Sequence, residues 1–173
     1  MKVEYLDIID KKGNVVGKDT RENLHHSPNK IHMTVNILII NSRDEILVQR
    51  RSLKKRYGAG CWEISAGGHV ESGSSPGKTA EKELKEELGI KAELTFISKK
   101  LYKFEHEQEL AHLYFGYSDG PFEIDRNEIE KIRLIKFTEL EGFLKRRNKV
   151  KSMLEYWMPI IKKNKELIFK NIL

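Results

Sequence analysis

Residues 67–90 read GGHVESGSSPGKTAEKELKEELGI, a glycine-rich loop that leads into a segment rich in Glu, Lys and Leu. Within it, residues 78–88 contain neither Gly nor Pro and are followed by Gly89. That pattern predicts a helix with a glycine C-cap. The helix would turn an apolar stripe towards the core, made of Ala80, Leu84 and Leu88.

Three carboxylates share one face of this predicted helix. At about 100° per residue, Glu83, Glu86 and Glu87 fall within an arc of about 100°. Carboxylates this close repel one another and raise one another's pKa unless a cation lies between them. Oxygen ligands alone suit Mg²⁺ or Mn²⁺ better than Zn²⁺. The alternative is a solvated acidic face that pairs with Lys82 and Lys85 at helical spacing.

The glycines before the helix favour the metal-binding alternative. Gly67 and Gly68 allow the backbone to approach a ligand closely, and Gly73 and Gly77 supply turn conformations. A loop followed by a helix beside a divalent ion is a common way to hold a diphosphate. The segment therefore predicts a site for a metal and a small-molecule diphosphate substrate.

The segment resembles the Nudix box, in which Gly, five residues, Glu, seven residues and Arg-Glu-apolar-any-Glu-Glu-any-Gly-apolar follow at fixed spacing. Seven positions match in register: Gly68, Glu83, Leu84, Glu86, Glu87, Gly89 and Ile90. Two positions depart, since Ser74 stands where Glu is expected and Lys82 where Arg is expected. We expect Glu71, three residues earlier in the loop, to supply the missing carboxylate to Lys82 or to the metal.

This resemblance implies a fold and an activity. The fold would be an α/β/α sandwich around a mixed sheet, and the cofactor would be Mg²⁺ or Mn²⁺. Glu83, Glu86 and Glu87 would hold the metal and carry catalysis. The protein would be a pyrophosphohydrolase that cleaves a diphosphate linkage in a nucleoside-diphosphate-type or related small substrate. Glu128 stands where Nudix enzymes often carry a late acid, which would be a further metal ligand or a base.

A wider stretch, roughly residues 5–140, is similar to the branch that includes the type I isopentenyl-diphosphate isomerases. By that similarity, Arg51 and Lys55 would clamp the diphosphate, with Gly67 and Gly68 close to it. The isomerases carry a catalytic cysteine where this chain has Gly67, so isomerisation lacks its expected acid. The similarity therefore leaves diphosphate hydrolysis open and argues against isomerisation.

The same similarity points to a second group of metal ligands. His25, His32 and His69 match positions that bind a second metal in the isomerases, and neutral imidazoles suit Zn²⁺ or Mn²⁺. The isomerases also use a Glu near this part of the sheet, for which Glu107 and Glu109 are candidates. Two alternative functions follow: an isomerase-like or isoprenoid-diphosphate enzyme, and a non-catalytic diphosphate-sensing module.

Length and composition bound the class of protein. The chain has 173 residues, of which 39% are hydrophobic and 34% charged, which suits one folded domain. No apolar run approaches the roughly 20 residues of a membrane helix, so no membrane partner is expected. A single cysteine, Cys61, is consistent with the reducing cytoplasm. We expect a cytoplasmic protein and leave a homodimer open.

The positive charge lies at one end of the chain. The net charge is +6, but residues 145–173 carry nine cations and two acids, whereas residues 1–144 carry 23 and 24. A body with no excess of cations gives no reason to expect a nucleic-acid partner.

The chain is expected to form one domain in three segments. Residues 1–30 would form an N-terminal hairpin, residues 31–144 the core, and residues 145–173 a basic amphipathic helix. Core strands are expected at 32–40, 45–50, 62–66, 92–104, 110–117 and 131–137, with a short helix after Thr138.

Overall fold

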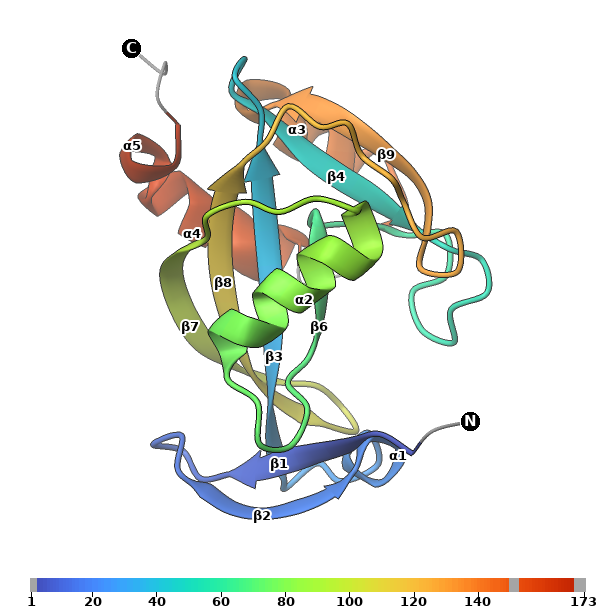
Figure 1. Ribbon diagram of the computed structural model, residues 1–173, viewed down its shortest axis with the longest axis vertical. Helices are drawn as coiled ribbons and strands as arrows, with labels where there is room; N and C mark the ends of the chain where they lie inside the picture. Colours follow the sequence, from blue (N-terminus) through green and yellow to red (C-terminus); the bar gives the residue numbers. More distant parts are fainter. Residues whose placement is uncertain (1–2, 150–152, 170–173) are drawn as a thin grey trace.

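A computed structural model describes residues 3–149 and 153–169 of the chain. In that part, one sheet of nine strands crosses the molecule (Figure 1). Strand β3 (Ile31–Ile40) lies at its centre and pairs in parallel with β8 (Gln108–Tyr117) along its whole length. The other strand pairs are antiparallel, so the sheet is mixed, as expected.

The remaining strands extend the sheet on both sides of β3. They are β1 (Tyr5–Ile9), β2 (Val15–Thr20), β4 (Glu45–Arg51), β5 (Trp62–Glu63), β6 (Ala66–His69), β7 (Thr95–Lys103) and β9 (Ile129–Lys136). Strands β1 and β2 form the expected N-terminal hairpin, which joins the sheet through the pair Ile9–Ile31. Strand β5 pairs with β4, whereas β6 pairs with β3. The short connection between β5 and β6 therefore carries the chain from the edge of β4 to the edge of β3.

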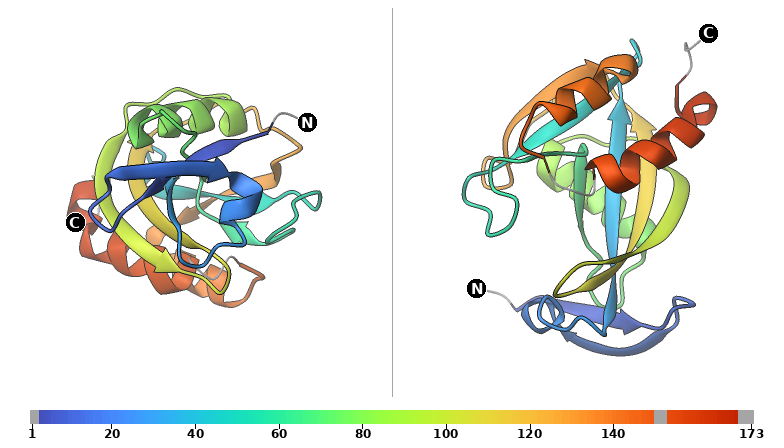
Figure 2. Two further views of the ribbon diagram at one scale, coloured as in Figure 1. Left: turned by 90° about the horizontal axis from the view of Figure 1, so that it is seen from below. Right: turned by 180° about the vertical axis from the view of Figure 1, so that it is seen from behind.

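Helices cover both faces of the sheet. Helix α2 (Pro76–Leu88) lies on one face, and α3 (Phe137–Lys145), η1 (Met153–Trp157), α4 (Met158–Lys163) and α5 (Lys165–Ile168) belong to the other side (Figures 1 and 2). Alternate residues of β3 enter two apolar clusters: Val35, Ile37 and Ile39 pack on the α2 side, and Leu38 and Ile40 on the opposite side. The expected α/β/α sandwich is confirmed.

Helix α2 forms where the sequence predicts it, with its start two residues earlier. Ser75 is the N-cap and accepts a hydrogen bond from the Lys78 backbone amide, while Pro76 takes the first turn, where its missing N–H costs nothing. Gly89 ends the helix at φ 70°, a left-handed conformation that favours glycine. The apolar stripe is buried as expected.

Several expected elements differ from those observed. The strand expected over 62–66 is two short strands, and the residues from Gly67 to His69, expected as loop, pair with β3. The short helix α1 (Arg21–Leu24) was not expected.

The terminal segment is not one helix over 145–173. Helix α3 ends at Lys145, and the helical structure that resumes at Met153 is interrupted at Asn164. Residues 150–152 and 170–173 lie outside the described residues. Throughout the described ranges, no helix is both long enough and apolar enough to cross a bilayer.

Candidate active site

Two of the three predicted carboxylates lie under α2, between the helix and the sheet. Glu87 is 6% exposed, and the Gln49 side-chain amide on β4 donates a 3.1 Å hydrogen bond to it. Glu83 lies against Gly68 on β6: a Cβ at position 68 would be 2.4 Å from the Glu83 carboxyl carbon. Glu86 differs, since its side chain is 57% exposed and lies 3.9 Å from Lys82. The structure thus brings Glu83 and Glu87 to the sheet and leaves Glu86 at the rim.

Burial dominates the electrostatics of this pair. It raises the pKa of Glu83 to about 7, with the negative charge of Glu86 adding to the effect. Burial, followed by the charges of Glu63, Glu83 and Glu128, raises the pKa of Glu87 well above its ordinary value. Carboxylates in such surroundings are either protonated or held by a cation. An all-oxygen donor set of this kind fits Mg²⁺ or Mn²⁺.

The predicted phosphate clamp is held by ion pairs. Arg51 Nη1 lies 2.5 Å from Glu63 Oε1, and Lys55 Nζ pairs with Glu128. Since Glu63 and Glu128 both act on the pKa of Glu87, the clamp and the carboxylates under α2 belong to one electrostatic cluster. Glu63 and Gln49 were missed by sequence reasoning. Successive side chains of a strand point to opposite faces of the sheet, and Trp62 on β5 packs in the core. That alternation could have predicted that Glu63 faces the opposite side.

The loop before α2 is braced from two sides. Lys82 Nζ lies 2.6 Å from Glu71 Oε1, which confirms the expectation that Glu71 supplies a carboxylate to Lys82. On β1, the Asp7 carboxylate accepts hydrogen bonds from Ser72 Oγ at 2.6 Å and from the Gly73 amide at 3.0 Å. The N-terminal hairpin therefore fixes the loop that leads into the helix.

Gly67 occupies a closed position on β6. It pairs with Asn36 on β3, and a Cβ added to it would lie 2.6 Å from the Val35 carbonyl oxygen. No side chain fits there unless the backbone shifts. Gly67 therefore offers a ligand only its backbone.

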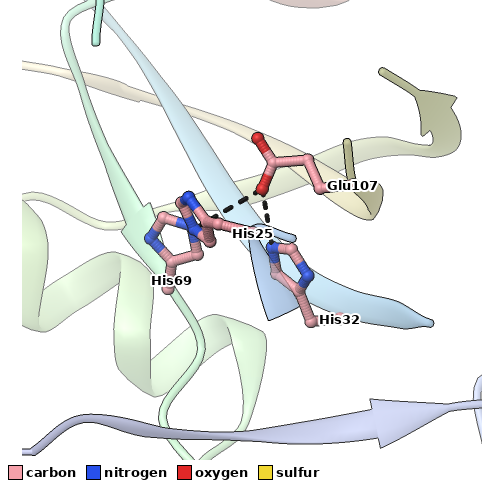
Figure 3. A group of neighbouring side chains, drawn as sticks. All are labelled: His25, His32, His69 and Glu107. Carbon is pink, nitrogen blue, oxygen red and sulfur yellow. Dashed lines mark hydrogen bonds and ion pairs between the residues drawn. The ribbon is translucent and has the colours of Figure 1, made fainter. Parts of the chain in front are cut away.

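A second cluster lies on the other face of the sheet. The ligand atoms of His25, His32, His69 and Glu107 all lie within 4.8 Å of one another (Figure 3). His25 Nε2 is 3.0 Å from His69 Nε2, and Glu107 Oε2 is 3.5 Å from His25 Nε2. Both ring nitrogens of His32 are buried and have no hydrogen-bond partner among the described residues, although Nε2 lies 3.9 Å from Glu107 Oε2.

Burial keeps the imidazoles of this cluster neutral at pH 7. Burial lowers the pKa of His25 and of His32 to about 4, and lowers that of His69 well below its ordinary value. Three neutral imidazoles and a carboxylate in contact form a donor set that fits Zn²⁺ or Mn²⁺.

Glu107 and Glu109 make different contacts. Glu107 joins the histidines, whereas Glu109 accepts a 3.1 Å hydrogen bond from Thr34 Oγ1, and burial raises its pKa to about 7. The register of β3 and β8 places Glu109 beside His32. Sequence reasoning named both acids without choosing between them, because that register is a long-range property.

Comparison with known proteins agrees with this geometry. The family profile described as NUDIX domain matches residues 30–157. The chain therefore belongs to the Nudix family. Among curated relatives, an isopentenyl-diphosphate Delta-isomerase of Serratia proteamaculans is 32% identical, over 68% of each chain. An uncharacterised Nudix hydrolase of Yersinia pestis is also 32% identical, over 75% of this chain and 71% of that one.

Solved structures show the same fold at lower identity. A crystal structure of a Deinococcus radiodurans protein has a TM-score of 0.77 at 19% identity, and covers 92% of this chain and 98% of that one. The NUDIX domain of Shewanella oneidensis NrtR, solved in complex with ADP ribose, has a TM-score of 0.62 at 12% identity. That match covers 76% of this chain and 86% of the other.

Proposed function

We propose that this Nudix protein is a metal-dependent pyrophosphohydrolase, which cleaves a diphosphate linkage in a nucleoside-diphosphate-type or related small substrate. The observation that carries the proposal is the pair of buried Glu87 and partly buried Glu83, in one electrostatic cluster with Arg51 and Lys55. Acids and cations set together in this way match a metal bound to an anionic substrate. The protein would act in the cytoplasm as one domain.

Each residue has a role in this proposal. Glu83 and Glu87 would hold Mg²⁺ or Mn²⁺ from beneath α2, and Glu86 would contribute from the exposed rim. A bound ion would polarise the attacking water and neutralise charge that develops on the phosphate. Arg51 offers a planar fork to phosphate oxygens and Lys55 a point charge.

The relatives support the substrate class. One curated relative bears the name Nudix hydrolase, and a structural neighbour was solved with ADP ribose, a molecule that contains a diphosphate linkage. We place the substrate among small molecules of this kind.

A second candidate is an isoprenoid-diphosphate enzyme. The cluster of His25, His32, His69 and Glu107 favours it, together with the relatives named isomerase. Gly67 argues against isomerisation itself, because glycine carries no thiol and the position has no room for a side chain. A third candidate, a diphosphate-sensing module without turnover, is favoured by Ser74 alone.

One panel of assays separates the three candidates. Phosphate release and product identity are measured with Mg²⁺ or Mn²⁺ on nucleoside diphosphate compounds, ADP ribose, isopentenyl diphosphate and dimethylallyl diphosphate. Hydrolysis of a nucleoside diphosphate compound is the expected result. Turnover confined to the isoprenoid compounds would favour the second candidate, and tight binding without turnover the third.

A further inference from the structure

Both cations proposed for the diphosphate are already occupied by carboxylates. Arg51 binds Glu63 at 2.5 Å, with the two side chains 23% and 18% exposed, and donates from Nε to the Tyr57 carbonyl at 3.1 Å. Lys55 binds Glu128 across the same part of the site. Carboxylate oxygens satisfy a guanidinium or an ammonium much as phosphate oxygens do. The two acids therefore stand where a diphosphate would bind.

The same two acids also interact electrostatically with the candidate metal ligands. Glu63 on β5 is the cross-strand partner of Gln49, whose side-chain amide donates a 3.1 Å hydrogen bond to Glu87. The negative charges of Glu63 and Glu128 accordingly both raise the pKa of Glu87. A divalent cation between Glu83 and Glu87 would attract Glu63 and Glu128 with twice the charge of a single Arg or Lys. Each acid thus has two competing partners, the clamp and the metal.

We propose that Glu63 and Glu128 are internal occupants of the diphosphate clamp, which they leave when a divalent cation is bound at Glu83 and Glu87. The inference rests on the proposed function and adds a regulation to it. In the metal-free protein, Arg51 and Lys55 are seldom free, so the affinity for a diphosphate falls in proportion to the fraction of time for which the clamp is open. Metal binding therefore prepares the clamp for substrate.

The test measures binding of methylenediphosphonate, a diphosphate that cannot be hydrolysed, by isothermal titration calorimetry in EDTA. The proteins are wild type and the double variant Glu63→Gln with Glu128→Gln. We expect the variant to bind about tenfold more tightly without metal, because its clamp has no internal occupant.

Two variants control for other effects. Glu130→Gln breaks a similar ion pair, since Glu130 binds Arg50 at 3.0 Å and Arg50 precedes Arg51 on β4. It should leave the diphosphonate affinity unchanged. Glu86→Gln removes a negative charge close to Glu83, but Glu86 is not the acid that holds Arg51 or Lys55. Any gain that it gives measures the general effect of lost negative charge.

A second arm adds Mn²⁺. We expect Mn²⁺ to increase diphosphonate affinity by a larger factor in wild type than in the double variant, because wild type alone has occupants to remove. The proposal is overturned if, in EDTA, the double variant binds the diphosphonate no more tightly than wild type does, or no more tightly than Glu86→Gln does. Absence of binding in all three proteins would also overturn it. Equal factors from Mn²⁺ in the two proteins would overturn the metal-dependent release.

The metal site itself is tested apart from the clamp. Electron paramagnetic resonance counts the Mn²⁺ bound by wild type and by Glu87→Gln without diphosphonate. Failure there would contradict the proposed function, yet the titrations in EDTA would still decide whether Glu63 and Glu128 occupy the clamp. Circular dichroism and thermal melts confirm that every variant is folded.

Discussion

The side chain of Glu83 fills the space that a side chain at position 68 would need, since a Cβ on Gly68 would lie 2.4 Å from the Glu83 carboxyl carbon. The Glu83 carboxylate can occupy this position only because residue 68 is glycine. Gly68 and Glu83 therefore depend on each other, although 14 residues lie between them in sequence.

Gly68→Ala should displace the Glu83 carboxylate and lower metal-dependent turnover by about 10–100-fold, the range seen when support of a metal ligand is lost. Gly17→Ala is the matched control, because a Cβ there meets only Ile8 Cδ1 at 3.6 Å. Steady-state rates and Mn²⁺ affinities of both variants are compared. Normal affinity in Gly68→Ala would show that Glu83 does not need its observed position.

Glu87→Gln should stabilise the metal-free protein, and more so at high pH. The folded state raises the pKa of Glu87 well above its ordinary 4.5, so wild type loses stability relative to the variant as pH rises above that value. One pKa unit corresponds to about 1.4 kcal/mol, or about 3–6 °C in Tm for a chain of this size. Melts in EDTA at pH 5 and pH 8 measure it. A difference between the two proteins that does not grow with pH would contradict the raised pKa.

The pair of Glu71 and Lys82 should support activity more than stability. Both side chains are about half exposed, and such pairs contribute about 0–1 kcal/mol to folding. We expect Glu71→Gln to lower turnover about tenfold with little change in Tm, and Ser74→Glu with Lys82→Arg to raise turnover. Glu81→Gln on the exposed side of α2 is the control. Wild-type rates in Glu71→Gln and no gain in the double variant would leave the brace without a catalytic role.

Isomerisation of isopentenyl diphosphate should be undetectable, and a thiol at position 67 should not restore it. Gly67→Cys places a Cβ 2.6 Å from the Val35 carbonyl oxygen, so β3 and β6 must separate. We expect a loss of stability of about 1–3 kcal/mol, as for other overpacked sites. Product analysis and thermal melts check both points. Isomerisation by wild type would show that another residue supplies the proton.

Local patterns predicted the parts of the site that lie within one element. The spacing of Glu83 and Glu87 and the cap at Gly89 follow from helix geometry, which depends on residues a few positions apart, whereas the helix begins at Pro76, two residues before its predicted start. The same periodicity did not distinguish Glu86, whose exposure depends on where the sheet edge lies. The family resemblance supplied the sandwich, which composition alone would have left among several α/β layouts.

Local sequence patterns could not predict contacts between segments that are distant in the sequence. Glu107, which immediately precedes β8, comes near His32 because β8 pairs in parallel with β3 in one register, and a slip of one residue would turn Glu109 to the other face. Glu63 meets Arg51 because β5 folds back on β4. The expected terminal helix over 145–173 was wrong because its apolar spacing is met by shorter helices that are interrupted at Asn164.

The central claim is that Glu87, buried beneath α2 beside Glu83, holds the metal that hydrolysis requires. The most direct measurement is Mn²⁺ binding and Mg²⁺-dependent turnover of wild type and Glu87→Gln, side by side, after melts have shown both to be folded. The claim predicts that the variant loses at least about 100-fold in turnover and binds Mn²⁺ more weakly. A folded Glu87→Gln protein with wild-type turnover and Mn²⁺ affinity would contradict it.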